Sequence, residues 1–381
     1  MISGWLKCLL VAVFSLFSTF IFAKDGGNEG GKKSFDANKV IFSHIMDAHE
    51  FHFFTYESSD GKEHHATIPL PVILYSPQKG FSFFMSSAFH HGEQDHNGYG
   101  ILTDEKIKDW GLDKKKFFAG QVFAVNENGE MDSTIKVYDI SLTRNVVQMI
   151  LALILLIWVM LAVAKKYNKG IGVNSAPKGI QNMLEPIINF IKDEVAIPAL
   201  GHKYEKYLPY ILTIFFFILF NNLVGLIPGA ANVTGNIAFT MVLALIAFVV
   251  ILLSSKKHYW GHIFWPPGVP LVVKFILIPV EFLGVFTKPF ALMIRLFANM
   301  VAGHIIIICL VSLIFIFGAM SKGLGWGFTP LSVGFVVFIY FIELLVVFLQ
   351  AYIFAFLTAV FIAQAFEGEH HHEEPVLVKS D

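Results

Sequence analysis

Arginine is almost absent from this chain, although basic residues are not. Of its 28 lysine and arginine side chains only two are arginines, Arg144 and Arg295. Arg295 lies in an apolar stretch that runs from Phe290 to Phe315, and an arginine at bilayer depth costs about 2.5–3.5 kcal/mol. Arginine also keeps its proton in proteins, so it cannot become neutral to lower that cost. A fixed positive charge at this position therefore indicates a function.

Cysteine and net charge are also scarce, and each scarcity excludes a class of protein. The two cysteines, Cys8 and Cys309, lie in apolar segments and leave no disulfide framework. A formal net charge of −1 and a pI near 7.0 argue against a nucleic acid partner. Apolar residues, in contrast, are abundant: they make up 55% of the chain, and its mean hydropathy is +0.62. This composition indicates a membrane protein.

The first 140 residues predict a secretory signal followed by a domain outside the membrane. Lys7, an apolar core from Leu9 to Phe22 and then Ala23 are typical of a signal peptide at residues 1–23, with a retained membrane helix as the alternative. Residues 24–140 are polar and hold eight of the 15 histidines. Within them the residues 66–75, 81–85 and 134–140 have the composition of β-strands. A small, mostly β, periplasmic domain is expected.

Histidines are frequent in this domain and in the C-terminal tail. His44, His49 and His52 have a spacing that resembles that of metal ligands, but it matches no established metal signature. The preferred interpretation is a polar adapter, and no metal or cofactor is predicted. Residues 367–381, also rich in histidine and glutamate, are expected to form a solvated tail.

Residues 141–366 predict a membrane domain with about five transmembrane helices. Uncharged runs at 146–164, 208–227 and 237–253 are long enough to cross a bilayer. Residues 177–200 instead repeat apolar side chains at helical spacing with charges interleaved, which predicts an amphipathic helix on the cytoplasmic surface. The expected fold is an all-α polytopic membrane protein with a small β domain outside the membrane.

The last two predicted helices are too long for an upright span. Pro279 and Pro289 are expected to kink or break the region that begins near Pro266. Residues 290–318 alone would form a helix of about 43 Å, and residues 331–366 one of about 54 Å, at 1.5 Å per residue. Because the hydrocarbon core is only about 30 Å thick, both helices should tilt steeply or run partly along the membrane.

The distribution of lysines predicts the orientation of the chain in its membrane. Ten lysines lie in the connections 165–207 and 255–274, whereas the opposite connections 229–236 and 319–330 hold only Lys322. Positively charged residues concentrate in cytoplasmic loops. The lysine-rich connections and the C-terminus are therefore expected in the cytoplasm, and the N-terminal domain in the periplasm.

A set of eight charged, amide and imidazole side chains lies in the last two long apolar regions. They are Glu281, Lys288, Arg295, Asn299 and His304 in the first, and Glu343, Gln350 and Gln364 in the second. Polar residues at this depth are costly and by default mark an ion path. On one continuous helix Lys288 and Asn299 share the face of Arg295, while His304 lies about half a turn away. Structural roles stay open as alternatives: an interhelical hydrogen bond for Asn299, a salt bridge for Arg295, and a Lys288 that extends to the surface.

Around these residues the chain resembles subunit a of the F-type ATP synthase. The motifs KPFALMIRLFANMVAG from Lys288 and LQAYIFAFLT from Leu349 carry the resemblance, which covers residues 140–366. It implies a ring of c subunits and a b-subunit peripheral stalk as partners. In that family the arginine matching Arg295 faces a carboxylate of the ring and separates two offset aqueous half-channels.

The resemblance also implies roles for the other polar residues. Asn299, His304, Glu343 and Gln350 match positions in the periplasmic half-channel, Glu281 matches an acidic position near the cytoplasmic one, and Lys288 and Gln364 are possible lining residues. Some bacterial members carry glutamate where His304 stands and histidine where Glu343 stands. This exchange suggests that the two side chains meet, and their titration chemistry predicts a proton relay.

The function implied by the resemblance is that of a transport subunit with no catalytic activity of its own. It would pass protons, with sodium the less expected ion, while ATP is made on other chains. The alternative is a self-contained polytopic ion channel or secondary transporter, but the internal repeats common in transporters are not evident here. A purely structural membrane anchor would leave Arg295, Glu281 and Glu343 unexplained.

Overall fold

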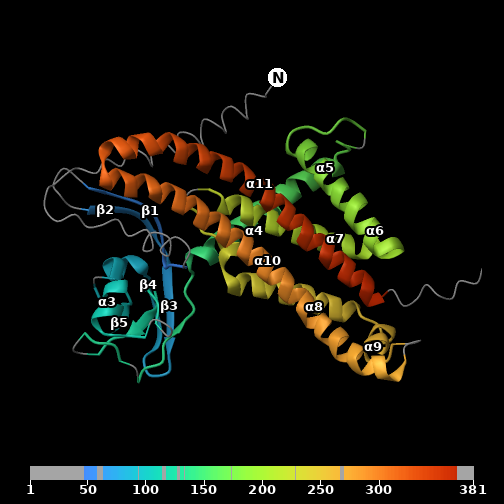
Figure 1. The fold of residues 1–381 in the computed structure, drawn as a ribbon, viewed down its shortest axis with the longest axis horizontal. Coiled ribbons are helices and arrows are strands. Elements are labelled where there is room, and N and C mark those ends of the chain that lie inside the picture. Colours follow the sequence, from blue (N-terminus) through green and yellow to red (C-terminus); the bar gives the residue numbers. More distant parts are fainter. Residues whose placement is uncertain are drawn as a thin grey trace, which may run out of the picture. The chain divides into compact units, whose positions relative to one another are not determined.

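The computed structural model describes residues 47–366 except 58–62, 93, 114–116, 127–128, 133, 173, 228 and 267–269. The chain divides into two compact units, drawn in Figure 1. The N-terminal unit is Met1–Val147 with Gly225–Ala231, and the membrane unit is Gln148–Val224 with Asn232–Asp381. The predicted signal peptide and the predicted tail lie outside the described residues.

The described part of the N-terminal unit contains three small antiparallel sheets, in agreement with a mostly β domain. They are formed by β1 (Glu50–Glu57) with β2 (Glu63–Pro69); by β4 (Gly80–Met85), β3 (Pro71–Ser76) and β7 (Tyr138–Asp139) in that order; and by β5 (Tyr99–Ile101) with β6 (Val122–Ala124). The strand predicted at 66–75 is divided at Leu70, whose amide donates to Ser86 Oγ at 3.0 Å. The strand predicted at 134–140 is reduced to the two residues of β7.

Two short helices of this unit were not predicted. They are the 3-10 helix η1 (Ser86–Gly92) and α3 (Asp104–Asp109). The start of α3 has a recognisable local signal, because the Thr103 side chain accepts a hydrogen bond from the Lys106 amide at 3.2 Å. The charged composition of α3 conceals its single buried apolar residue, Ile107.

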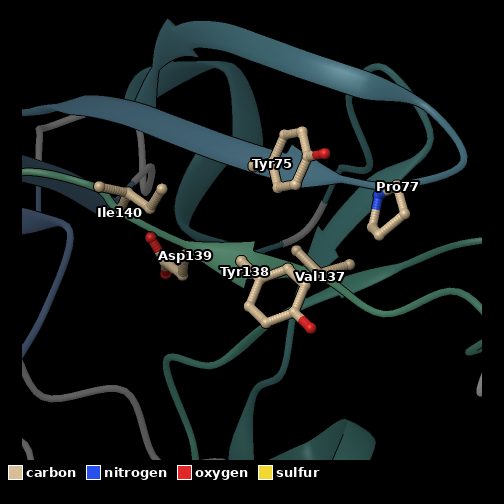
Figure 2. A pocket seen from close by; sticks show the side chains of 6 residues that line it. All are labelled: Tyr75, Pro77, Val137, Tyr138, Asp139 and Ile140. Atoms are coloured by element: carbon tan, nitrogen blue, oxygen red, sulfur yellow. The ribbon is translucent and has the colours of Figure 1, made fainter.

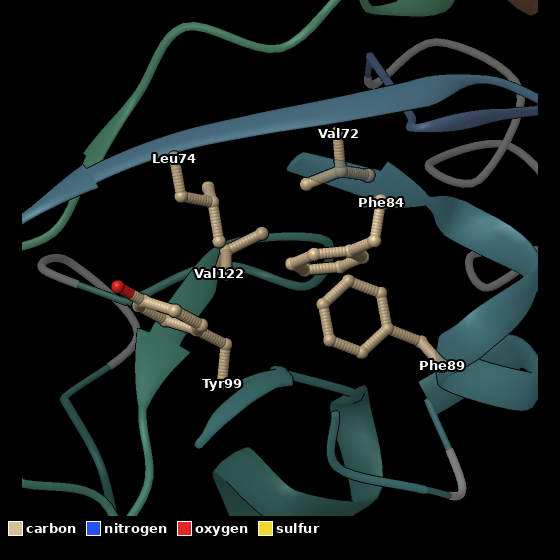
Figure 3. Close-up of a cluster of buried hydrophobic side chains, with 6 residues drawn as sticks. All are labelled: Val72, Leu74, Phe84, Phe89, Tyr99 and Val122. Atoms are coloured by element: carbon tan, nitrogen blue, oxygen red, sulfur yellow. The ribbon is translucent and has the colours of Figure 1, made fainter. Parts of the chain in front are cut away.

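The core of the N-terminal unit lies against one face of the β4–β3–β7 sheet. Figure 3 shows it as six buried side chains: Val72, Leu74, Phe84, Phe89, Tyr99 and Val122. Val72 and Leu74 are two residues apart on β3, so they point to the same side of the sheet. The rings of Phe84 and Phe89 meet edge to face with centroids 5.1 Å apart.

Five helical stretches of the chain are long and apolar enough to cross a membrane, as predicted. They are Arg144–Asn168 (α4), Ile180–Gly225, Ile237–Ser254 (α8), Leu271–Met320 (α10) and Lys322–Phe366 (α11). The second stretch comprises several elements: α5 (Ile180–Ile191), the π-helical turn η2 (Lys192–Ala196), α6 (Ile197–Leu200), η3 (Gly201–Lys203) and α7 (Tyr204–Gly225). The predicted amphipathic segment thus ends at Gly201, whose φ of 54° interrupts the helix before α7. Its location on the membrane surface stays a prediction.

The two C-terminal helices are longer than predicted, and the expected breaks are absent. α10 spans 50 residues and passes through both Pro279 and Pro289, which gives a length of about 75 Å at 1.5 Å per residue. α11 spans 45 residues and begins at Lys322, inside the segment predicted as an outer loop. Proline is tolerated in such helices because neighbouring helices and small local adjustments satisfy the freed carbonyl. A short helix before α10, α9 (Lys257–Phe264), was also not predicted.

Helix packing in the membrane unit follows the periodicity of small and apolar residues. α10 and α11 run side by side along their length, with α8 packed against both (Figure 1). The buried residues of α8 are Thr240, Leu243, Ala244, Ala247 and Ile251, which form one helical face. On α11 the buried alanines Ala351, Ala355, Ala359 and Ala363 recur every four residues. Such small residues let helix backbones approach closely in a membrane.

Candidate functional site

Three polar contacts connect α10 and α11 at different heights along the pair. They are His304 Nδ1 to Glu343 Oε1 at 3.2 Å, Asn299 Nδ2 to Gln350 Oε1 at 2.9 Å, and Lys288 Nζ to Gln364 Oε1 at 2.7 Å. We call them the first, second and third polar rungs. From the first rung to the third, the residue numbers decrease along α10 and increase along α11, so the two helices are antiparallel. Six of the eight predicted intramembrane polar residues thus pair across one helix interface.

The first rung contains a buried carboxyl group with few partners. Glu343 is 4% exposed, and neither of its carboxyl oxygens has a hydrogen bond of good geometry with the described residues. The His304 Nδ1 atom lies 3.2 Å from Glu343 Oε1 and 3.1 Å from the carbonyl oxygen of Met300. The predicted meeting of His304 and Glu343 is therefore present, whereas their relay role stays a prediction. A buried carboxyl without hydrogen bonds is costly unless a proton or water reaches it.

Glycine 303 makes room for the carboxyl group of Glu343. A Cβ atom at this position would lie 2.5 Å from Glu343 Oε1 and 3.0 Å from its carboxyl carbon. Any larger residue would therefore displace the carboxyl group or separate the helices. This glycine was part of the recognised motif, but the need for a glycine at position 303 becomes visible only when α11 is placed against α10.

A polar network from the connection between α7 and α8 reaches the first rung. Asn232 Nδ2 donates to the Met300 carbonyl at 3.4 Å, the same oxygen that lies near His304. Two residues further along the chain, Thr234 Oγ1 donates to Asn222 Oδ1 at 2.6 Å. Asn222 is fully buried, and its Nδ2 atom has no hydrogen bond with the described residues. The sequence held a signal for this network, because three asparagines and a threonine lie within 15 residues at the end of α7 and in the connection that follows it.

Arg295 occupies a position between the second and third rungs without joining either. It lies on α10 in a half-buried position, and it forms no hydrogen bond or ion pair with the residues that the structure describes. Its neighbours along the helix differ sharply: Leu296 is fully buried, while Ile294 is 43% exposed. The guanidinium therefore stands at the edge of the helix interface, beside a surface that is open in this chain.

The part of α11 between the second and third rungs is nearly free of polar groups. Residues 351–363 include only two hydroxyl-bearing side chains, Tyr352 and Thr358, and no charged ones. Phe354 and Ala355 are fully buried there. At the height of Arg295, α11 therefore offers an apolar wall in place of a counter-ion.

Glu281 is placed on the same long helix but belongs to none of the rungs. It is half-buried and precedes Lys288 by seven residues, which is two helical turns. From Glu281 to His304 the polar positions extend over about 35 Å of α10 at 1.5 Å per residue, close to the thickness of the hydrocarbon core, about 30 Å. The expected break at Pro289 is absent, because α10 is unbroken there, so these positions share one continuous helix.

The described residues contain no group of three or more histidine, cysteine or acidic side chains arranged to hold a metal ion. The predicted histidine motif begins at His44, outside the described residues, and the side chains of residues 52–65 are likewise not described. Of that motif, His49 contacts Asp139 through Nε2 and Oδ2 at 2.7 Å.

Comparison with known proteins assigns families to both units. Residues 146–363 match the family described as ATP synthase A chain, and residues 40–140 match a domain of unknown function. ATP synthase subunit a of Chloroherpeton thalassium is 47% identical over 242 residues, which are 62% of this chain and 70% of that protein. ATP synthase subunit a 2 of Prosthecochloris aestuarii is 40% identical over 294 residues, 76% and 86% of the two chains. ATP synthase subunit a of Myxococcus xanthus is 40% identical over 254 residues, 62% and 76% of the two chains.

Proposed function

This chain belongs to the ATP synthase A chain family, and on that premise we propose that it is the proton-translocating stator subunit of an F-type ATP synthase. It is a multi-pass membrane protein with five helical stretches long enough to span a bilayer. Its proposed role is to conduct protons to and from a rotating ring of c subunits. ATP is made on other chains of the complex, so this subunit has no catalytic activity of its own.

The observation that carries the proposal is the isolation of Arg295 between two separated polar regions. The first and second rungs lie on one side of it and the third rung on the other, while α11 is apolar at its height. A polar path that crossed the membrane continuously would need polar groups in this interval. The interruption supports two paths, each open to one side of the membrane.

Arg295 transfers no proton itself; it acts on a carboxyl group of the partner ring. A carboxyl group beside a fixed positive charge is favoured in its ionised form. A protonated carboxyl can face lipid, whereas an ionised one is expelled from lipid at high cost. Each ring site must therefore release its proton near Arg295 and take up another before it moves on into the bilayer. Protons then cross only by travelling with the ring, which makes it rotate.

The first two rungs and the α7–α8 network form the proposed periplasmic path. His304 and Glu343 stand where an imidazole and a carboxyl group can exchange a proton directly or through one water. The Glu343 carboxyl oxygens and the Asn222 amide nitrogen have no hydrogen bond of good geometry with the described residues, and a chain of water would satisfy these buried polar groups. The Asn299–Gln350 bond continues this polar surface toward Arg295.

The proposed cytoplasmic path includes Glu281, Lys288 and Gln364. Lys288 bonds Gln364 at 2.7 Å and lies 5.1 Å from the ring centre of Phe361. Glu281 is the only carboxyl group among these three residues, and it is the candidate proton acceptor on this side.

The proposal includes the assembly and the orientation. The subunit works with the c ring, a b-subunit peripheral stalk and the rest of the ATP synthase in a bacterial inner membrane. The N-terminal unit lies in the periplasm and the C-terminus in the cytoplasm. The reason is that the connections 165–207 and 255–274, on the same side of the membrane as the C-terminus, hold ten lysines, and lysines concentrate in cytoplasmic loops. Protons are the proposed coupling ion, with sodium as the alternative.

The test is the substitution Arg295→Lys, followed by ATP-driven proton pumping in inverted membrane vesicles. Lysine keeps the charge but is more strongly hydrated and loses its proton more easily on burial, so pumping is expected to fall to background while the complex still assembles. Lys322→Gln is the matched control, since it removes an exposed charge at the turn between α10 and α11. Full pumping by the Arg295→Lys complex would contradict the proposed barrier.

A further inference from the structure

The N-terminal unit carries an apolar surface that lies outside the core formed by its described residues. On the face of the β4–β3–β7 sheet opposite the core, six side chains are exposed: Tyr75 (36%), Phe81 (76%), Phe83 (70%), Met85 (42%), Tyr138 (52%) and Ile140 (58%). We call this set the outer sheet face. Antiparallel sheets with one face on a core usually present polar residues on the other. An exposed apolar patch of this kind marks an interaction site.

The strand register assembles the outer sheet face into one continuous surface. Tyr75 is opposite Phe81 on β4 and opposite Tyr138 on β7, and Phe83 is opposite Ile73. The rings of Tyr75 and Phe81 have centroids 4.7 Å apart, and those of Tyr75 and Tyr138 are 6.3 Å apart. A hollow of about 630 Å³ is lined by Tyr75, Pro77, Val137, Tyr138, Asp139 and Ile140. Figure 2 shows these six side chains.

The outer sheet face is followed in the sequence, after a few residues, by the helix α4. Beyond β7 the chain continues along β3, with hydrogen bonds from Ile140 N to Ile73 O at 2.9 Å and from Leu142 N to Pro71 O at 3.3 Å. α4 begins two residues later, at Arg144, whose amide donates to the Ala48 carbonyl at 2.9 Å. Ile140 therefore lies at most about 13 Å from the start of the span, at 3.3 Å per extended residue.

The chemistry of this surface fits the boundary between lipid and water. Tyrosine rings concentrate at membrane interfaces because their apolar body and polar hydroxyl prefer different sides. Phe81, Phe83 and Ile140 supply apolar area next to Tyr75 and Tyr138, and the exposed residue Lys136 lies two positions before Tyr138. A lysine at the margin can reach lipid phosphates.

We propose that the outer sheet face is a membrane-contacting surface that seats the N-terminal unit on the headgroup region of the bilayer. Its tether is short, so the sheet is held beside the membrane and docking requires little additional loss of freedom. The interfacial zone is several ångströms deep on each side of the hydrocarbon core, deep enough to receive the aromatic rings. This inference does not depend on the proposed proton path.

The test places a nitroxide spin label on this surface in the intact complex. The complex, with Cys8 and Cys309 replaced by serine, carries Phe83→Cys or Phe81→Cys and is reconstituted in nanodiscs of phosphatidylcholine and phosphatidylglycerol. Lys108→Cys, an exposed site at the end of α3, is the matched control. Relaxation of the label by oxygen, which is enriched in lipid, is compared with relaxation by a water-soluble nickel chelate.

The expected result is a ratio of oxygen to nickel accessibility several-fold higher at positions 81 and 83 than at position 108. A ratio equal to that of the control would show an outer sheet face in water and overturn the proposal. Protection of the labels from both reagents would show that another protein covers the surface, and it would equally overturn docking to lipid. Both variants change exposed side chains, and co-purification of the complex confirms their folding.

Discussion

The Glu343 carboxyl group is 4% exposed, and its oxygens have no hydrogen bond of good geometry with the described residues. Such a group can lower its free energy by binding a proton, by pairing with a cation or by contact with water. His304 offers the second of these at 3.2 Å. Arg295 differs, since the guanidinium cannot become neutral and has no partner among the described residues. The two residue types therefore suit two tasks: Glu343 and His304 exchange protons, whereas Arg295 is a fixed charge.

We expect His304→Ala to abolish most ATP-driven proton pumping, because Glu343 then loses the imidazole that lies 3.2 Å from its carboxyl oxygen. The exchange variant, His304→Glu with Glu343→His, should pump better than either single substitution, since it keeps one imidazole and one carboxyl group. Dye quenching in inverted vesicles measures both. Ser332→Ala is the control, because it removes a different α10–α11 hydrogen bond, to Leu310 O at 2.9 Å. Normal pumping by His304→Ala would refute the relay.

Gly303→Ala should reduce pumping while the complex assembles normally. The new methyl group would lie 2.5 Å from Glu343 Oε1, so the flexible carboxyl group must move away from His304. Gly284→Ala on the same helix is the matched control, because nothing lies within 4 Å of its added Cβ. Equal proton pumping by the two variants would show that the position of the Glu343 carboxyl is not critical.

At the scale of the element, the long α10–α11 pair determines which polar groups meet. The Asn299–Gln350 and Lys288–Gln364 contacts join residues 51 and 76 positions apart in the chain. Small residues allow this closeness: a Cβ on Gly325 would lie 2.8 Å from Gly318 Cα near the turn, and the alanine stripe of α11 follows. The register of the rungs is thus a consequence of packing along the whole pair.

Ala355→Leu should disturb this register by overpacking the interface. Ala355 is fully buried, and extra methylene groups in a packed core cost about 1–3 kcal/mol. The expected outcome is a smaller amount of this subunit in the assembled complex and faster proteolytic cleavage of the chain at the turn between α10 and α11. Ala238→Leu, at an exposed position of α8, is the control. A stable Ala355→Leu complex with unchanged proteolysis would mean that the helices are not in close contact at this height.

At the scale of the whole molecule, the two units are stabilised by different means. The membrane unit packs apolar helices with a few internal polar contacts, whereas the N-terminal unit has a small aromatic core and a partly buried contact between His49 and Asp139. Burial tends to raise the pKa of Asp139, but hydrogen bonds from His49 and Ser141 outweigh it and hold that pKa below its usual range. The stability of the N-terminal unit should therefore decrease at acid pH.

Because the pKa of Asp139 is lowered by folding, its stabilising effect is fully present above the unfolded value, about 3.9. It is lost as the pH falls through the lower folded value. The advantage of the natural chain over Asp139→Asn should accordingly shrink below about pH 4. Hydrogen exchange of the β3 amides in the full complex, corrected for intrinsic rates, measures this difference. Asp109→Asn, at an exposed carboxyl of α3, should show no such trend.

Local patterns were sufficient to predict the class of fold. Hydrophobic runs predicted five spans, and the structure confirms them, because a run of about 20 apolar residues has few other stable forms. The prolines misled the prediction at Pro279 and Pro289, since proline in a membrane helix is compensated by its surroundings. The helices η1 and α3 were missed because short polar helices carry little periodic signal.

The sequence by itself determined that this chain is a membrane protein, that Arg295 lies in an apolar stretch where charge is costly, and which residues are candidates for an ion path. Only the tertiary structure decided the geometry of the predicted His304–Glu343 meeting, with Nδ1 3.2 Å from Oε1, and that Asn232 and Met300 extend this site and α11 is apolar beside Arg295. The physical reason is that composition and periodicity act locally along one chain segment. Contacts between segments far apart in the chain depend on how closely two helices pack, which no single segment encodes.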